Sequence, residues 1–158
     1  MAISVTLHIL AAVIWVGGMF FAYLCLRPAA QAVLEPEQRL TLWVNTFDRF
    51  FVWVFIAIIV ILASGYWMIF NEYGGFKGIG INIEIMQVLG IIMMLIFAHV
   101  YFAPFKRLKR FVAARDFPQA GKNLQQIRVL VAINLVIGLA TIIVAAAGPH
   151  LLYSMDMN

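Results

Sequence analysis

The chain has 158 residues, of which 65% are hydrophobic and only 11% are charged. Soluble domains are typically about 45–50% apolar and about 25% charged, so this composition excludes an ordinary soluble enzyme, a nucleic-acid-binding module and a disordered chain. The length fits a single domain covering residues 1–158. Because Cys25 is the only cysteine, an intrachain disulfide and a zinc site built on cysteine pairs are also excluded.

Four stretches are long and apolar enough to cross a bilayer, whose core of roughly 30 Å requires about 20 helical residues. They cover residues 3–26, 50–70, 83–105 and 129–153. The first stretch lacks the basic leading region and the cleavage site of a signal peptide, so we expect it to be retained. No stretch alternates between polar and apolar residues as a membrane β-strand does. The sequence therefore predicts an all-α integral membrane protein, a four-helix bundle.

The predicted connections between the spans are short. Arg27-Pro28 is expected to end the first span, and the sequence LEPE at residues 34–37 is typical of a helix start, which predicts a brief surface helix within residues 29–48. Pro118 and Gly121 are expected to break any long helix within residues 111–124, and Gly148-Pro149 to interrupt the last span.

The basic residues predict the orientation of the bundle. Every Lys and Arg except Lys77 lies in or beside the first or the third connection. The positive-inside rule places those connections in the cytoplasm and both termini on the outer (periplasmic) side. The net charge of +4 is then chiefly a signal of topology, with attraction to anionic lipid as a secondary role, and it gives no support to nucleic-acid binding.

Ionisable side chains inside a membrane span are costly and are therefore functional candidates. On its helix, His8 shares a face with Trp15 and Met19, and the adjacent Gly17-Gly18 would admit a neighbouring helix or a flat ligand. One interpretation makes His8 a ligand with an aromatic wall that faces a haem or a metal ion. The alternative is a buried histidine that bonds to a carbonyl, Ser or Thr of another helix.

His99 is the second intramembrane histidine. Lys106 and Arg110 follow on its helix face, an arrangement that suits a haem whose propionates reach a basic rim, although these two cations more commonly mark the cytoplasmic border. His8 is predicted about 10 Å outward of the middle of its span and His99 roughly 7–8 Å inward of the middle of its own. The resulting gap of about 17 Å disfavours one haem bound by both histidines.

Other polar residues suggest a separate outer site. His8, Glu84 and His150 lie toward the outer side and have ligand types that suit zinc or copper. Met155 and Met157, together with His150, would offer soft ligands to Cu(I), although a frayed apolar terminus is the commoner explanation.

Two uncharged polar side chains, Gln87 and Asn134, also lie within the predicted spans. We interpret both as interhelical contacts, each contributing roughly 0.6–2 kcal/mol.

Several segments resemble the copper-resistance D (CopD-like) membrane family. Residues 7–18 (LHILAAVIWVGG) are similar to the opening helix of that family, and residues 63–67 (ASGYW) and 127–135 (IRVLVAINL) to its second and fourth helices. The layout also resembles the HemJ-type protoporphyrinogen oxidases, in which a first-helix histidine precedes Trp and Gly, and a third-helix histidine precedes basic residues. The chain departs from that second family where Gln87-Val88 stands in place of its third-helix Lys.

The candidate residues and these resemblances together give three hypotheses for a multi-pass protein of a bacterial-type inner (plasma) membrane. The leading hypothesis is a haem-b-binding redox protein with His8 and His99 as the principal ligands, an oxidoreductase that would exchange electrons with quinone or a redox partner, or oxidise a porphyrinogen-like substrate. The second is a copper-binding or copper-transport protein that uses His8, His150 and the terminal methionines. The third is an accessory membrane subunit whose histidines are structural. Independently of these hypotheses, a homodimer is suggested because four helices bury little of their own surface.

Overall fold

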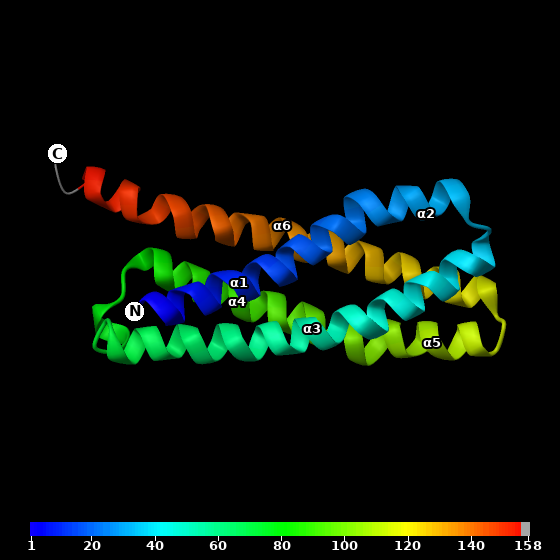
Figure 1. Ribbon diagram of the computed structural model, residues 1–158, viewed down its shortest axis with the longest axis horizontal. Coiled ribbons are helices and arrows are strands. Elements are labelled where there is room, and N and C mark those ends of the chain that lie inside the picture. The colour runs from blue at the N-terminus through cyan, green and yellow to red at the C-terminus, as the bar shows by residue number, and fades with distance from the viewer. Residues whose placement is uncertain (156–158) are drawn as a thin grey trace.

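The computed structural model describes residues 1–155, with the side chains of residues 1–148, and it contains no strand within that range. Figure 1 shows a bundle of long helices that run up and down one axis. The elements are α1 (Ala2–Phe20), η1 (Phe21–Leu26), α2 (Arg27–Val33), α3 (Pro36–Asn71), η2 (Phe76–Gly78), α4 (Ile81–Val100), η3 (Tyr101–Phe105), α5 (Lys106–Ala113) and α6 (Phe117–Met155). Because α1, η1 and α2 run on without a break, as do α4, η3 and α5, the predicted four helices that could span a membrane are confirmed.

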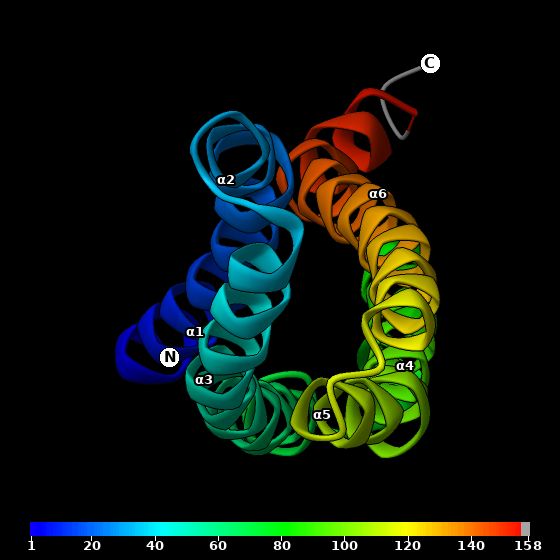
Figure 2. The same cartoon turned by 90° about the vertical axis from the view of Figure 1, so that its right-hand side faces the viewer.

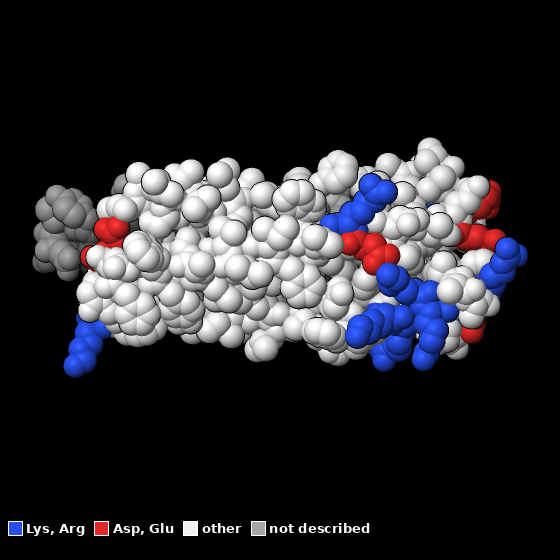
Figure 3. Space-filling view, turned by 60° about the horizontal axis from the view of Figure 1, so that its bottom comes forward, with Lys and Arg blue, Asp and Glu red and all other residues white. Residues whose placement is uncertain are grey.

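The four long helices form two antiparallel pairs. The first span packs mainly against α3, and α4 with α5 packs against α6, as Figure 2 shows in end view. We call the end that holds α2, α5 and the two short turns beside them the basic end, since the Lys and Arg side chains gather there (Figure 3). The opposite end, which holds the start of α1, η2 and the last turns of α6, is the distal end.

The turn between α2 and α3 is much shorter than the sequence predicted. Only Leu34 and Glu35 lie outside the helices, and α3 begins at Pro36 with Glu35 and Gln38 forming a reciprocal capping box. The predicted helix start is therefore correct. The predicted brief surface helix within residues 29–48 is wrong, because α3 continues without interruption to Asn71.

Proline does not break these helices where the sequence predicted. The first helix continues through Arg27-Pro28 because the preceding segment, η1, is π-helical. Proline lacks an N–H and crowds the carbonyl four residues earlier, and the wider turn of a π-helix accommodates it. Pro104 lies within the second π-helical segment, η3. Pro118 is in the first turn of α6, where its missing N–H is not needed, and α6 continues through Gly121 and Gly148-Pro149.

The helices are longer than a bilayer requires. At about 1.5 Å per residue, the 36 residues of α3 extend about 54 Å, whereas the hydrocarbon core is about 30 Å thick. The excess lies at the basic end, since residues 27–33, 36–49, 106–113 and 117–128 are helical but fall outside the predicted spans. The basic end therefore extends beyond the apolar part of the bundle.

Close packing is concentrated toward the basic end. The ring centroid of Phe51 lies 5.2 Å from that of Phe47, 5.3 Å from that of Phe97 and 4.9 Å from that of Phe105. Leu108, Ile127 and Val54 are fully buried in the same core, whereas residues 58–92 and 136–148 contribute no buried side chain to it. The basic half of the bundle thus holds most of its core.

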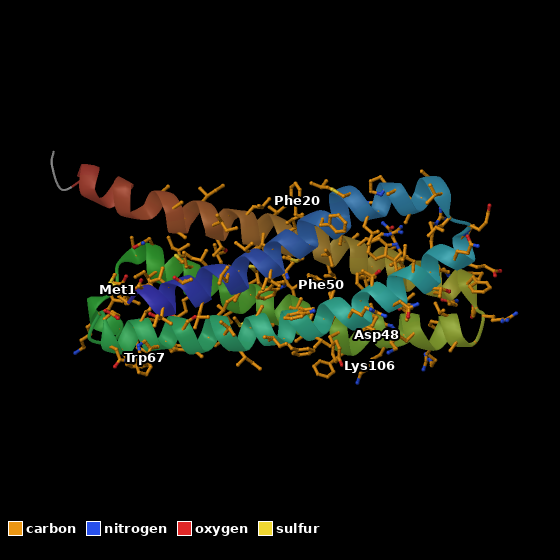
Figure 4. The ribbon with its side chains drawn as sticks, viewed as in Figure 1. Met1, Phe20, Asp48, Phe50, Trp67 and Lys106 are labelled. Carbon is orange, nitrogen blue, oxygen red and sulfur yellow. The ribbon has the colours of Figure 1, made fainter. Side chains whose placement is uncertain are left out.

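Glycines allow the helices to cross closely. A β-carbon at Gly18 would collide with the ring of Phe50, which lies on α3 near the middle of the bundle (Figure 4). One at Gly138 would lie 2.9 Å from a methyl carbon of Val16. The predicted close approach of a neighbouring helix is therefore confirmed at Gly18, whereas Gly17 faces open space.

Candidate functional site

The candidate site centres on His8, which α3 holds by a hydrogen bond. The Nδ1 atom of His8 lies 3.0 Å from Oγ of Ser64. The Ser64 hydroxyl donates its hydrogen to the backbone carbonyl of Val60 at 2.6 Å, so its oxygen is left to accept from His8. The backbone carbonyl of Ile61 lies 3.3 Å from the same Ser64 Oγ atom.

These partners fix the tautomer of the imidazole. Since the Ser64 hydroxyl uses its hydrogen on the Val60 carbonyl, its oxygen accepts, which assigns the hydrogen to Nδ1 and leaves the lone pair on Nε2. The ring lies against Gly65, where a β-carbon would be 3.3 Å from Cε1 of His8. His8 is half-buried and Ser64 is buried, so the pair is an oriented imidazole with one nitrogen committed to the protein.

The partners of His8 were not identified from the sequence as part of a site. In the sequence, Ser64 and Gly65 were identified only as part of the segment 63–67 that resembles the CopD-like family. The available signal was a small polar residue next to glycine inside a membrane span, which allows a neighbouring helix to approach and also supplies a hydroxyl.

Trp15 lies on the predicted face of α1 but belongs to the packed core. It is buried, and its ring meets the edge of Phe97 at a centroid distance of 6.2 Å. At about 1.5 Å per residue it lies about 10 Å along α1 from His8. Its described surroundings are those of a packing residue.

The structure does not bring His99 together with His8. On α4, Phe97 and Val100 face the core, whereas His99 is exposed on the outer surface of the bundle. Lys106 and Arg110 are exposed as well, and each lies over a ring of its own helix, Phe102 and Phe111 respectively, at 5.1 Å. No hydrogen bond in the described part of the chain joins His99 to His8 or to these cations.

The residues predicted for an outer metal site are only partly described. Glu84 is exposed in the first turn of α4. The side chains of His150 and Met155 lie outside the described residues, as does Met157 altogether. Among the described side chains, no three His, Cys, Asp or Glu residues converge on one point. A copper or zinc site that includes these residues stays a prediction.

The uncharged polar residues join neighbouring helices, as predicted. Gln87 donates to the Tyr66 hydroxyl at 3.4 Å, which links α4 to α3. Asn134 donates to the backbone carbonyl of Met93 at 3.4 Å, which links α6 to α4. Asn134 is only 3% exposed, and its Oδ1 atom has no hydrogen-bond partner among the described residues.

Two small hollows lie between the helices. The first, of about 280 Å³ including its open part, is lined by aromatic and aliphatic side chains together with Asn134. The second, of about 250 Å³, lies nearer the basic end and is lined by Tyr23, Arg27, Trp43 and Arg128 among others. Both hollows are narrow, and neither is lined by His8 or His99.

Four long apolar helices, with a hydroxyl-bonded histidine between two of them, define a multi-pass membrane protein whose surroundings are a lipid bilayer. Residues 44–147 match the model of the CopD family, described as copper resistance protein D. Since the match covers about two thirds of the chain, this protein belongs to the CopD family, as its segments had indicated. The match includes Ser64 and His99 but begins after His8, and the chain matches no curated protein and no solved structure.

Proposed function

We propose that this CopD-family protein handles copper in the distal half of the bundle and that Nε2 of His8 is one of the ligands. The observation that carries the proposal is the hydrogen bond between His8 and Ser64. A ligating histidine typically donates its other ring N–H to a protein acceptor, which orients the ring and makes the ligating nitrogen more basic. The neutral imidazole of His8 has that arrangement, and imidazole is a suitable ligand for copper.

Further ligands are needed to hold a copper ion, and the topology suggests where they lie. The start of α1 and the last turns of α6 are at the same end of the bundle (Figure 1). His150 and Met155 belong to those turns of α6 and Met157 follows them in the sequence; their imidazole and thioether groups suit Cu(I). Copper would be the cargo of a single four-span domain, residues 1–158, rather than a permanent cofactor.

The charge distribution indicates on which side of the membrane His8 would meet copper. The positive-inside rule favours the basic end in the cytoplasm and the distal end on the outer side of a bacterial-type inner membrane. His8 would then receive or release copper near the outer face.

Copper binding by the purified full-length chain tests the proposal. The affinity for Cu(I) is measured in detergent under reducing conditions, by competition with a coloured copper chelator. We expect the His8→Ala variant to lose the tightest-bound ion and the His99→Ala variant to retain it. Unchanged stoichiometry and affinity in the His8→Ala variant would contradict the proposal.

Haem b, with His8 and His99 as ligands and Lys106 and Arg110 as propionate partners, stays an alternative hypothesis. The family match indicates copper, and the exposed position of His99 gives a haem bound by both histidines no support. An absorption spectrum separates the two hypotheses: a Soret band with reducible α and β bands, lost in either histidine variant, favours haem. Electron exchange with quinone and porphyrinogen oxidation would become relevant only after that result.

The accessory-subunit hypothesis makes a third, distinct expectation. In that case the contact between His8 and Ser64 only joins α1 to α3, and the purified chain binds neither copper nor haem. A partner, or a second copy of the chain, would then cover part of the exposed apolar surface.

A further inference from the structure

Three arginines from three helical segments converge near the basic end. Arg27 begins α2, Arg39 lies in the first turns of α3, and Arg128 lies on α6. Arg27 and Arg39 are close enough to Arg128 for their positive charges to repel it. None of the three forms an ion pair with a carboxylate within the described residues, where Lys109 is the one Lys or Arg that does, with Asp48.

The second hollow lies beside this cluster and is lined by Arg27 and Arg128. Each guanidinium stacks on an aromatic ring of the same hollow: Arg27 lies 5.1 Å from the ring centroid of Tyr23, and Arg128 lies 6.0 Å from that of Trp43. Stacking holds a guanidinium in place while its N–H groups stay available at the edge.

Two buried donors in the lining have no acceptor. Trp43 is only 3% exposed, and its indole Nε1 has no hydrogen-bond partner in the part of the chain that the structure describes. The same is true of Nε of Arg128. A buried donor without an acceptor is destabilising. Both orphaned atoms are donors and the nearby formal charges are positive, so an acceptor that carries negative charge would suit this position.

We propose that this hollow binds a phosphate group and that the phosphate belongs to the headgroup of an anionic lipid. Arg27 and Arg128 would contact the phosphate oxygens, and Trp43 would donate its indole N–H to them. The location supports a lipid source, because Arg27 directly follows the first predicted span and Arg128 directly precedes the fourth, and basic pockets between membrane helices bind such headgroups. The inference is independent of the copper proposal.

The test uses the full-length chain in a neutral detergent. Ligand binding raises Tm, so the apparent affinity is obtained from Tm in titrations with phosphatidylglycerol, phosphatidylcholine and inorganic phosphate. We expect phosphatidylglycerol to stabilise the chain more than phosphatidylcholine, whose choline neutralises the phosphate charge. If inorganic phosphate stabilises the chain and phosphatidylglycerol does not, the phosphate site stands but its lipid source is overturned.

Matched variants separate this site from general charge attraction. Arg128→Gln is expected to weaken phosphatidylglycerol binding about tenfold or more, because a charge-assisted hydrogen bond is lost. Trp43→Phe keeps the ring and the charge, and is expected to weaken binding about threefold to tenfold through loss of one N–H. Lys122→Gln removes the same charge from an exposed position on α6 and should leave the affinity unchanged.

Three results would overturn the inference: equal stabilisation by the two lipids, an equal loss in the Lys122→Gln variant, or unchanged affinity in both the Arg128→Gln and Trp43→Phe variants. Circular dichroism establishes that each variant folds. If Arg128→Gln does not fold, Arg27→Gln takes its place, since Arg27 also lines the hollow and its loss should weaken binding in the same way.

Discussion

The two halves of the bundle differ in how their helices are held together. In the basic half, stacked aromatic rings and fully buried side chains such as Leu108 and Ile127 fill the space between the helices. In the distal half, residues 58–92 and 136–148 add no buried side chain to that core, and a polar contact between His8 and Ser64 joins α1 to α3. Regions with few buried contacts open at a lower free energy. We infer that stability resides mainly in the basic half and that the chemistry of His8 resides in the half that moves more easily.

The largest test of this comparison truncates one phenylalanine in each half. Phe51→Ala removes a ring that is 3% exposed and contacts several other rings, and we expect it to lower the free energy of unfolding by about 3–5 kcal/mol. Phe70→Ala removes a ring that is 58% exposed in the distal half, where we expect a loss of less than about 1 kcal/mol. Denaturant titrations in mixed micelles measure both. Equal losses would show that the distal half is as tightly packed as the basic half.

The second test concerns the polar contact of the distal half. Ser64→Ala removes the hydroxyl that accepts from His8, and under the copper proposal the affinity for Cu(I) should fall by about 10–100-fold, because loss of such an outer partner leaves the ligand ring free to turn. Thr141→Ala is the matched control, because among the described residues its hydroxyl bonds to a carbonyl of its own helix, that of Ile137. Chelator competition measures the affinity, and an equal loss in the control would exclude a role for the orientation of His8.

A smaller effect is expected at Asn134, which lies near the boundary between the two halves. Replacing it by Leu removes a 3.4 Å hydrogen bond to Met93, and it also removes a buried oxygen that has no described partner. Hydrogen bonds between membrane helices contribute about 0.6 kcal/mol on average, and the two changes offset each other, so the free energy of unfolding should change by less than about 1 kcal/mol. A loss above about 2 kcal/mol would indicate that Oδ1 does have a partner, such as a water molecule in the adjoining hollow.

The sequence was sufficient to predict the four spans, because length and apolar composition alone determine which segments cross a bilayer. It did not predict the continuity of the helices at the basic end. Pro28 and Pro104 are compatible with continuous helices here because the π-helical segments beside them shift the backbone hydrogen bonds by one residue. The rule that proline ends an α-helix assumes α-helical hydrogen bonds and therefore does not predict this outcome.

The candidate site was predictable only in part, for a related reason. His8 is conspicuous because an imidazole is rare in a membrane span. Ser64 is not, since a serine hydroxyl in a helix commonly bonds to a carbonyl of its own helix, and its contact with His8 depends on which helix packs beside α1. Arg27 and Arg128 were already explained as topology signals, so their convergence beside Trp43 could be recognised only from the way η1, α2, α3 and α6 surround the hollow.

The smallest effect is expected from the ion pair between Lys109 and Asp48, which joins α5 to α3 at the basic end. The two charged groups lie 2.7 Å apart, and their side chains are 46% and 42% exposed. A double-mutant cycle of Lys109→Gln and Asp48→Asn should give a coupling of about 0.5 kcal/mol that declines with added salt, because water screens exposed pairs. A coupling well above about 1 kcal/mol that persists in salt would mean that something covers the pair. The basic end would then be enclosed by lipid or by a second protein, and its stability would depend on that partner as well as on its aromatic core.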